Sequence, residues 1–193
     1  MFVYFSLEQV RNQDFRGPDF FVALDVPTHS RKSWVVWQEG KGPDVVIELL
    51  SETTAARDKG EKKDVYQNCL RVPEYVWFDP YTAEWAGFVL RDGRYEPIEV
   101  DAQGRLISQR LGLALLRWEG SYLGERARWL RWATLEGTLL PTPREVAEAE
   151  TRHAAEAERR AVEVEQQAAD AQQQAADAQQ QATEAQQQAT EAQ

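Results

Sequence analysis

The sequence is poor in the residues that build disulfide frameworks and has no long apolar run. Its 193 residues include 1 Cys, 1 Met and 2 His. The single thiol, Cys69, excludes an internal disulfide framework and fits a reducing compartment, so we expect a cytoplasmic protein. No apolar run reaches the length of about 18 residues that a membrane helix needs. The first ten residues carry no basic region or small-residue cleavage site, so we expect no secretory signal.

Basic residues are outnumbered by acidic ones, and this excess of negative charge is unevenly distributed along the chain. The net charge is −10, and the segment from Arg144 onward holds 4 Arg against 11 acidic residues, or −7. Residues 1–143 therefore carry a net charge of only −3, so most of the net negative charge comes from the C-terminal segment. This balance disfavours a broadly basic surface but leaves room for a local basic groove. The candidates for such a groove, if they are not scattered surface charges, are Arg11, Arg16, Arg31 and Lys32.

The C-terminal segment, residues 144–193, has no Gly or Pro after Pro143 and repeats a seven-residue unit, DAQQQAA. Alanines recur in it at steps of three and four residues, at positions 168, 171, 175, 178, 182, 185, 189 and 192. This spacing predicts a long helix with Ala in a heptad seam. Ala buries little area, so both a solvated single helix and a coiled coil that joins copies of the chain stay open.

All 7 Trp, 7 Phe and 6 Tyr lie before position 133, which confines the core to residues 1–143. The most informative stretch there runs from Gly42 to Pro80. A continuous apolar run, Val45 to Leu50, predicts a strand buried on both faces and is interrupted by one acid, Glu48. A buried carboxylate is costly unless it is paired or holds a cation. A second strand is expected from Tyr75 to Asp79.

Between these strands we expect one helix from Ala55 to Leu70. Five residues share a face by their three- and four-residue spacing: Asp58, Lys62, Val65, Tyr66 and Cys69. Because this face carries the apolar residues, it should pack on the sheet and take Lys62 inward. Lys59 and Lys63 fall on other faces and are expected to be solvated.

The flanking segments predict further strands. MFVYFSL and the stretch from Asp19 to about Leu24 are two candidates. Trp85–Leu90 and Arg94–Ile98 flank a tight turn and predict a β-hairpin. LGLALLRWEG and a closing hairpin over residues 128–140 should follow. Helices and strands together predict an α/β (α+β) domain with a mixed sheet and hairpins, followed by a long C-terminal helix.

The runs PDVVIELLSETT and EKKDVYQNCLRVPEYVWFDP resemble the Uma-two family of the PD-(D/E)XK nuclease superfamily. The resemblance covers about residues 2–143, although Glu52 replaces a usual Pro and Arg71 stands near a common Gly. It implies a restriction-endonuclease-like fold, DNA as substrate and a divalent cation, Mg²⁺ or Mn²⁺. In the family a helix and a strand precede the strand at MFVYFSL. We therefore expect them to be missing here and residues 2–5 to form a strand with unpaired backbone groups.

The resemblance also implies the site, because superfamily nucleases hold the metal with an Asp and a Glu on neighbouring strands. Asp44 lies four residues before Glu48, roughly 13 Å away along one strand, too far to share a cation. Asp19 lies on another strand, within reach, so we assign Asp19 and Glu48 as metal ligands. The alternatives are a strand-start acid for Asp19 and a buried ion pair with Lys62 for Glu48. The superfamily lysine position holds Leu50, and Lys62 is its expected substitute.

Three functions follow from this pattern. The preferred one is a metal-dependent DNA endonuclease with Asp19, Glu48 and Lys62 as catalytic residues. The second is a catalytically silent nuclease-like binding module. The third is an interaction protein that acts through its coiled-coil tail.

Overall fold

The structure, a computed structural model, describes residues 1–6 and 15–191, so the candidate Arg11 lies outside the described residues. The chain forms two compact units, Met1–Leu140 and Pro141–Gln193, and each is described by itself. The first unit is mixed α and β, which confirms the predicted fold class.

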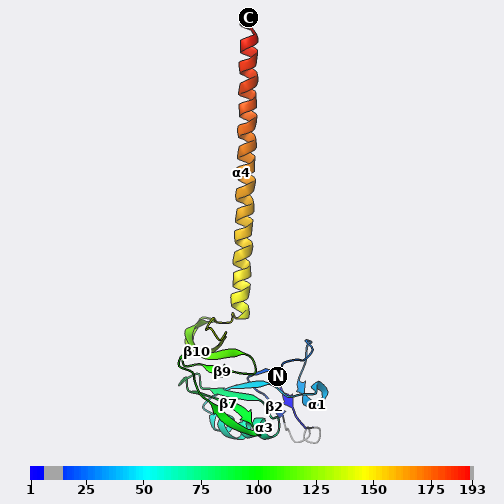
Figure 1. The fold of residues 1–193 in the computed structure, drawn as a ribbon, viewed down its shortest axis with the longest axis vertical. Helices are drawn as coiled ribbons and strands as arrows, with labels where there is room; N and C mark the ends of the chain where they lie inside the picture. Colours follow the sequence, from blue (N-terminus) through cyan, green and yellow to red (C-terminus); the bar gives the residue numbers. More distant parts are fainter. Residues whose placement is uncertain (7–14, 192–193) are drawn as a thin grey trace. The chain divides into compact units, whose positions relative to one another are not determined.

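A five-stranded mixed sheet forms the centre of the first unit (Figure 1). Its strand order is β3-β5-β6-β7-β8, and only the central pair, β5 and β6, is parallel. The strands are β3 (Phe20–Val22), β5 (Val45–Leu49), β6 (Glu74–Phe78), β7 (Trp85–Arg91) and β8 (Arg94–Ile98). The predicted hairpin is therefore present, and its turn residues Asp92 and Gly93 both have positive φ, as a type I′ turn requires.

Two three-stranded sheets accompany the central one, in the orders β2-β1-β4 and β11-β10-β9. Their strands are β1 (Val3–Tyr4), β2 (Phe15–Arg16), β4 (Trp34–Val35), β9 (Leu106–Ser108), β10 (Leu113–Tyr122) and β11 (Glu125–Ala133). The expectation of an unpaired strand near residues 2–5 is wrong. β1 lies in the middle of its sheet, antiparallel to β2 and parallel to β4, and Val3 is fully buried.

The segment between β5 and β6 is not the single α-helix that the sequence predicts. It begins as α2 (Ala55–Arg57), continues as a π-helical turn, η2 (Asp58–Lys62), and ends as α3 (Lys63–Asn68). Lys62 and Tyr66 nevertheless share the predicted inward face, since both contact Glu48. Cys69 directly follows the last residue of α3 and is exposed rather than inward as predicted.

The central sheet is covered on both faces. Val46 and Tyr75 cluster with Tyr66 of the helical segment, with Leu70 just after it, and with Val3 of the N-terminal sheet. On the opposite face, a second cluster joins the central strands to β9 and β10, through Val45, Ile47, Val76, Leu106 and Leu115. β5 is therefore buried on both sides, as its continuous apolar run predicted.

The closing part of the unit differs from the prediction. The main hairpin joins β10 to β11 through Leu123 and Gly124, both with positive φ, so the second strand begins at Glu125 rather than at residue 128. The expected hairpin around Gly137 is reduced to one isolated bridge, Ala133 to Leu139. A short helix, α1 (Val36–Glu39), follows β4.

The second unit is a single long helix, α4 (Pro143–Glu191), of 49 residues (Figure 1). Most of its described side chains, up to residue 176, are exposed. Across the described parts of the chain, no helix has the length and apolar character required to cross a membrane.

Candidate functional site

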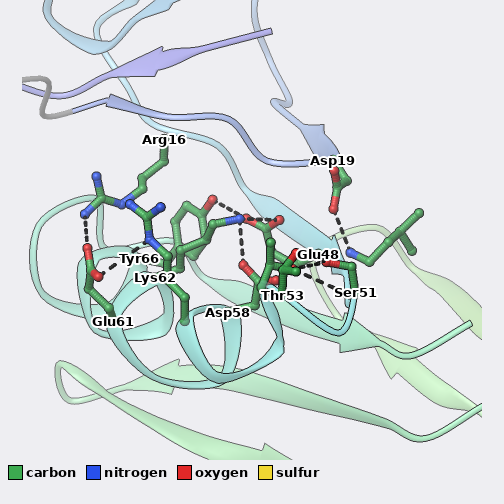
Figure 2. Close-up of polar contacts among 12 residues, drawn as sticks. Arg16, Asp19, Glu48, Ser51, Thr53, Asp58, Glu61, Lys62 and Tyr66 are labelled. Carbon is green, nitrogen blue, oxygen red and sulfur yellow. Dashed lines mark hydrogen bonds and ion pairs between the residues drawn. The ribbon is translucent and has the colours of Figure 1, made fainter. Parts of the chain in front are cut away.

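The candidate site is built around Glu48, at the C-terminal end of β5. The side chain points from the central sheet toward the helical segment and is 0% exposed. Its Oε1 accepts a hydrogen bond from the Tyr66 hydroxyl at 2.6 Å, and its Oε2 lies 3.1 Å from the Lys62 Nζ (Figure 2). β5 thus places the Glu48 carboxylate in the core, where it contacts the Tyr66 hydroxyl and the Lys62 ammonium group.

Burial dominates the electrostatics of this carboxylate. Loss of hydration raises the pKa of Glu48 to about 7, although the Tyr66 hydrogen bond and the Lys62 charge oppose the rise. Burial also raises the pKa of Tyr66 well above its usual range, and the neighbouring Glu48 charge adds to this. Tyr66 therefore stays protonated and can only donate to the carboxylate. Near neutral pH, Glu48 is close to the midpoint of its titration.

Lys62 is held between two acids. Its Nζ lies 2.6 Å from Asp58 Oδ1 and 3.1 Å from Glu48 Oε2, and Asp58 is as deeply buried as Glu48. Burial acts to lower the pKa of Lys62, but the two carboxylates outweigh it and raise the pKa above its usual value. Asp58 and Lys62 are the first and last residues of η2, and the Tyr75 hydroxyl fixes this turn by donating to the Asp58 carbonyl at 2.8 Å.

Asp19 lies at the edge of the same site, just before β3. β3 pairs with β5 so that Phe20 is opposite Ile47, and the register continued by one residue sets Asp19 opposite Glu48. The Asp19 Oδ2 accepts the backbone N–H of Leu49 at 2.8 Å (Figure 2). Its charge contributes to the raised pKa of Glu48. The structure thus brings the three predicted site residues to one place, with Asp19 exposed and Glu48 enclosed.

Two other buried acids serve the fold at the opposite end of β5 and β6. Asp44 pairs with Lys41 at 2.5 Å and with Arg110, and it accepts the Leu24 N–H at 2.8 Å. These partners outweigh its burial and lower the pKa of Asp44. Asp44 is therefore a structural ion-pair partner, in keeping with its exclusion from the metal site.

Glu74, at the start of β6, was not singled out by the sequence. It accepts a hydrogen bond from the Ser108 hydroxyl at 2.5 Å and another from the Arg110 N–H at 3.0 Å. Both donors come from the region around β9, so Glu74 links the central sheet to the sheet that covers it. Its place in the strand motif VPEYVWF gives no local sign of these distant partners.

The basic residues are also more engaged than predicted. Lys59 Nζ lies 4.2 Å from the centroid of the Trp77 ring, and Lys63 Nζ lies 3.5 Å from that of Phe88. Burial lowers the pKa of Lys63, so the expectation of a solvated charge is wrong there. Arg31 pairs with Glu39 at 2.7 Å and donates to two backbone carbonyls, whereas Lys32 is exposed.

The donor set suits a hard divalent cation held by few protein ligands. Two carboxylates, those of Glu48 and Asp58, flank the Lys62 ammonium group, and the Asp19 carboxylate lies at the edge of the site, so the three acids and the lysine together carry −2 when all are ionised. Within residues 1–6 and 15–191, no three His, Cys, Asp or Glu side chains are grouped as metal ligands. A small hard cation such as Mg²⁺ commonly binds through one or two carboxylates and retains water, so the carboxylates here fit a divalent cation of this kind.

The mixed central sheet, the acid at the C-terminal end of its buried strand and the adjacent lysine define a restriction-endonuclease-like domain. A comparison with family models agrees with this class: residues 3–121 match the Uma2 family, described as "Putative restriction endonuclease". The chain belongs to the Uma2 family. A comparison with curated proteins found no match.

Proposed function

We propose that this protein is a metal-dependent endonuclease that hydrolyses phosphodiester bonds in DNA. The observation that carries the proposal is the fully buried Glu48 carboxylate beside Lys62, in a chain of a restriction-endonuclease-like family. Asp19 and Glu48 would hold the divalent cation, Mg²⁺ or Mn²⁺. When bound, the cation would stabilise charge that develops on the phosphate and lower the pKa of its water ligand. We place this activity in the cytoplasm, where the protein meets DNA.

The remaining residues of the site orient these groups. The protonated Tyr66 hydroxyl fixes one oxygen of Glu48. Asp58 holds the Lys62 ammonium group, so that Lys62 keeps a charged partner when Glu48 engages a cation. Lys62 would then position the attacking water or the scissile phosphate. In this arrangement Lys62 of the helical segment takes the role of the superfamily lysine, whose usual position two residues after Glu48 holds the buried Leu50.

The test is a cleavage assay on DNA with Mg²⁺ or Mn²⁺, combined with calorimetric titration of each metal. We expect Asp19→Ala and Glu48→Ala to abolish cleavage and weaken metal binding. Lys62→Ala should retain the metal and lose most of the rate, because the lysine is not a ligand. Lys59→Ala is the matched control, since Lys59 belongs to the same turn but contacts Trp77 and Glu84 instead.

A wild-type protein that cleaves no DNA with either metal and binds neither in calorimetry would refute this function. The silent nuclease-like binding module would then be the better description. Equal loss of rate in the Lys59 and Lys62 variants would instead remove the special role of Lys62.

We further propose that α4 joins copies of this chain. The helix is continuous, its described residues from position 151 to 176 are exposed, and its sequence has Ala at heptad spacing. Sedimentation equilibrium of the full chain and of a chain ending at Pro143 tests this idea. A full chain that stays monomeric at high concentration would contradict it.

A further inference from the structure

Next to the proposed site, the carboxylate of Glu61 lies between two guanidinium groups. Its Oε1 is 3.1 Å from Arg16 Nη2, and its Oε2 is 3.5 Å from Arg57 Nε. Glu61 belongs to η2 and directly precedes Lys62, whereas Arg16 comes from β2 and Arg57 from α2. Figure 2 shows Arg16 and Glu61 facing each other beside Lys62 and Tyr66. One arginine of the helical segment and one from a distant strand therefore meet the same carboxylate at the rim of the site.

This ion pair does not account for the burial of Arg16. Its side chain is 11% exposed, and its Nε is buried without a hydrogen-bond partner among the described residues, while Nη1 donates to the Phe15 carbonyl. An unpaired buried donor costs about 1–3 kcal/mol. Glu61 is 59% exposed, and an ion pair to so exposed a group contributes roughly 0–1 kcal/mol. Folding stability alone thus gives little reason to hold a guanidinium group here.

The geometry resembles that of a bound phosphate. Each oxygen of Glu61 faces a different arginine, as the two non-bridging oxygens of a phosphodiester would. Arginine is the preferred residue for such planar, multiply hydrogen-bonded recognition of phosphate. The two arginines exceed the one acid by a single positive charge, and the exposed Glu61 can move away from them.

We propose that Arg16 and Arg57 bind a backbone phosphate of the DNA strand that enters the site, and that Glu61 occupies their donors until the phosphate displaces it. The proposal rests on the proposed nuclease function. In this proposal Glu61 competes with DNA for the two arginines. Loss of Glu61 should therefore raise the affinity for DNA, whereas loss of either arginine should lower it. The phosphate would take the place of the Glu61 carboxylate, and because Glu61 directly precedes Lys62, this would align the DNA strand with the catalytic lysine.

The experiment measures binding of a short fluorescein-labelled DNA duplex of mixed sequence by anisotropy, at several salt concentrations in buffer with a chelator. Glu61→Gln should bind severalfold more tightly than wild type, because it removes the competing charge. Arg16→Gln should bind about tenfold more weakly, and the slope of log Kd against log salt should fall by about 1, as expected for one lost phosphate contact. Circular dichroism checks that each variant is folded.

The matched control is Glu96→Gln. Glu96 of β8 is 56% exposed and pairs with Arg91 of β7 at 3.6 Å, so the exchange alters net charge equally at a glutamate of similar exposure. Its affinity for DNA should stay within twofold of wild type. An equal gain in the Glu61 and Glu96 variants would overturn the proposal, because net charge alone would then explain the effect.

The remaining outcomes separate this inference from the function on which it rests. A wild-type protein that binds and cleaves DNA, with unchanged affinity in the Glu61 variant, overturns the phosphate site and leaves the nuclease intact. A wild-type protein that binds no duplex even at low salt overturns both. If Arg16→Gln does not fold, the change in DNA affinity of Glu61→Gln decides: tighter binding supports the phosphate site, and unchanged or weaker binding overturns it.

Discussion

Replacement of Glu48 by Gln tests the electrostatics of the site without reference to catalysis. Gln keeps the shape and an acceptor for the Tyr66 hydroxyl but cannot ionise. The folded protein raises the pKa of Glu48 from the ordinary 4.5 to about 7. The stability that this group contributes is therefore fully present below pH 4.5 and is lost as the pH rises through about 7. The pKa difference corresponds to about 3 kcal/mol.

We therefore expect Glu48→Gln to gain stability over wild type as the pH rises, by about 3 kcal/mol between acid and weakly alkaline conditions. Urea unfolding at a series of pH values, in buffer with a chelator, measures the difference. Tryptophan fluorescence is the appropriate probe, because all 7 Trp lie in the first unit and none in α4. Lys62 does not disturb the comparison, since Asp58 still holds its charge.

A stability difference that stays constant across this pH range would refute the reasoning, because it would show that burial does not raise the pKa of Glu48. Addition of Mg²⁺ supplies a second comparison. If Glu48 is a ligand, the cation should stabilise wild type above pH 7 and leave the Gln variant almost unchanged. Equal stabilisation of both proteins would locate the cation elsewhere.

Three further predictions concern other parts of the chain. Asp44→Asn should lower the free energy of unfolding at neutral pH by about 1.5–3 kcal/mol, because its hydrogen bonds to charged groups are lost while Lys41 and Arg110 remain partly exposed to water. That penalty should shrink as the pH falls through the lowered pKa of Asp44, since wild type then loses the same ion pairs; urea unfolding at two pH values checks it. Removal of residues 144–193 should reduce the far-ultraviolet helical signal yet leave the fluorescence-detected thermal midpoint nearly unchanged, and a large drop would show that α4 supports the fold. Cys69 should react with a thiol reagent as fast in the native protein as in urea, and slow native labelling would contradict its exposure.

Local patterns in the sequence were sufficient to predict several parts of the structure. The apolar run of β5 predicted burial on both faces, because a strand that is covered on both sides lacks the alternation of apolar and polar residues seen in a half-exposed strand. The β7–β8 hairpin followed from its Asp-Gly turn. The four-residue step between Lys62 and Tyr66 predicted that both side chains turn toward the sheet, and there both contact Glu48.

The features that were missed depend on partners distant in the sequence or on the point at which a helix ends. The strand at MFVYFSL was predicted, but its pairing was not, because β1 pairs with β4 about thirty residues away and a local pattern does not identify such a partner. Glu74 is satisfied by donors from β9 and the residues that follow it. Cys69 was predicted to face inward because the helix was expected to continue to Leu70, whereas α3 ends at Asn68.

The positions of the buried acids have a consequence for how such a protein evolves. The carboxylates that tie the fold together, Asp44 and Glu74, lie at one end of the parallel strands, and the carboxylate of the site, Glu48, lies at the other. A lineage released from selection for cleavage can therefore exchange Glu48 for a neutral residue and keep every bond that joins its sheets. Because that exchange also removes a buried charge, drift and selection for stability would act in the same direction. Descendants that are folded but inert are thus an expected product of this architecture.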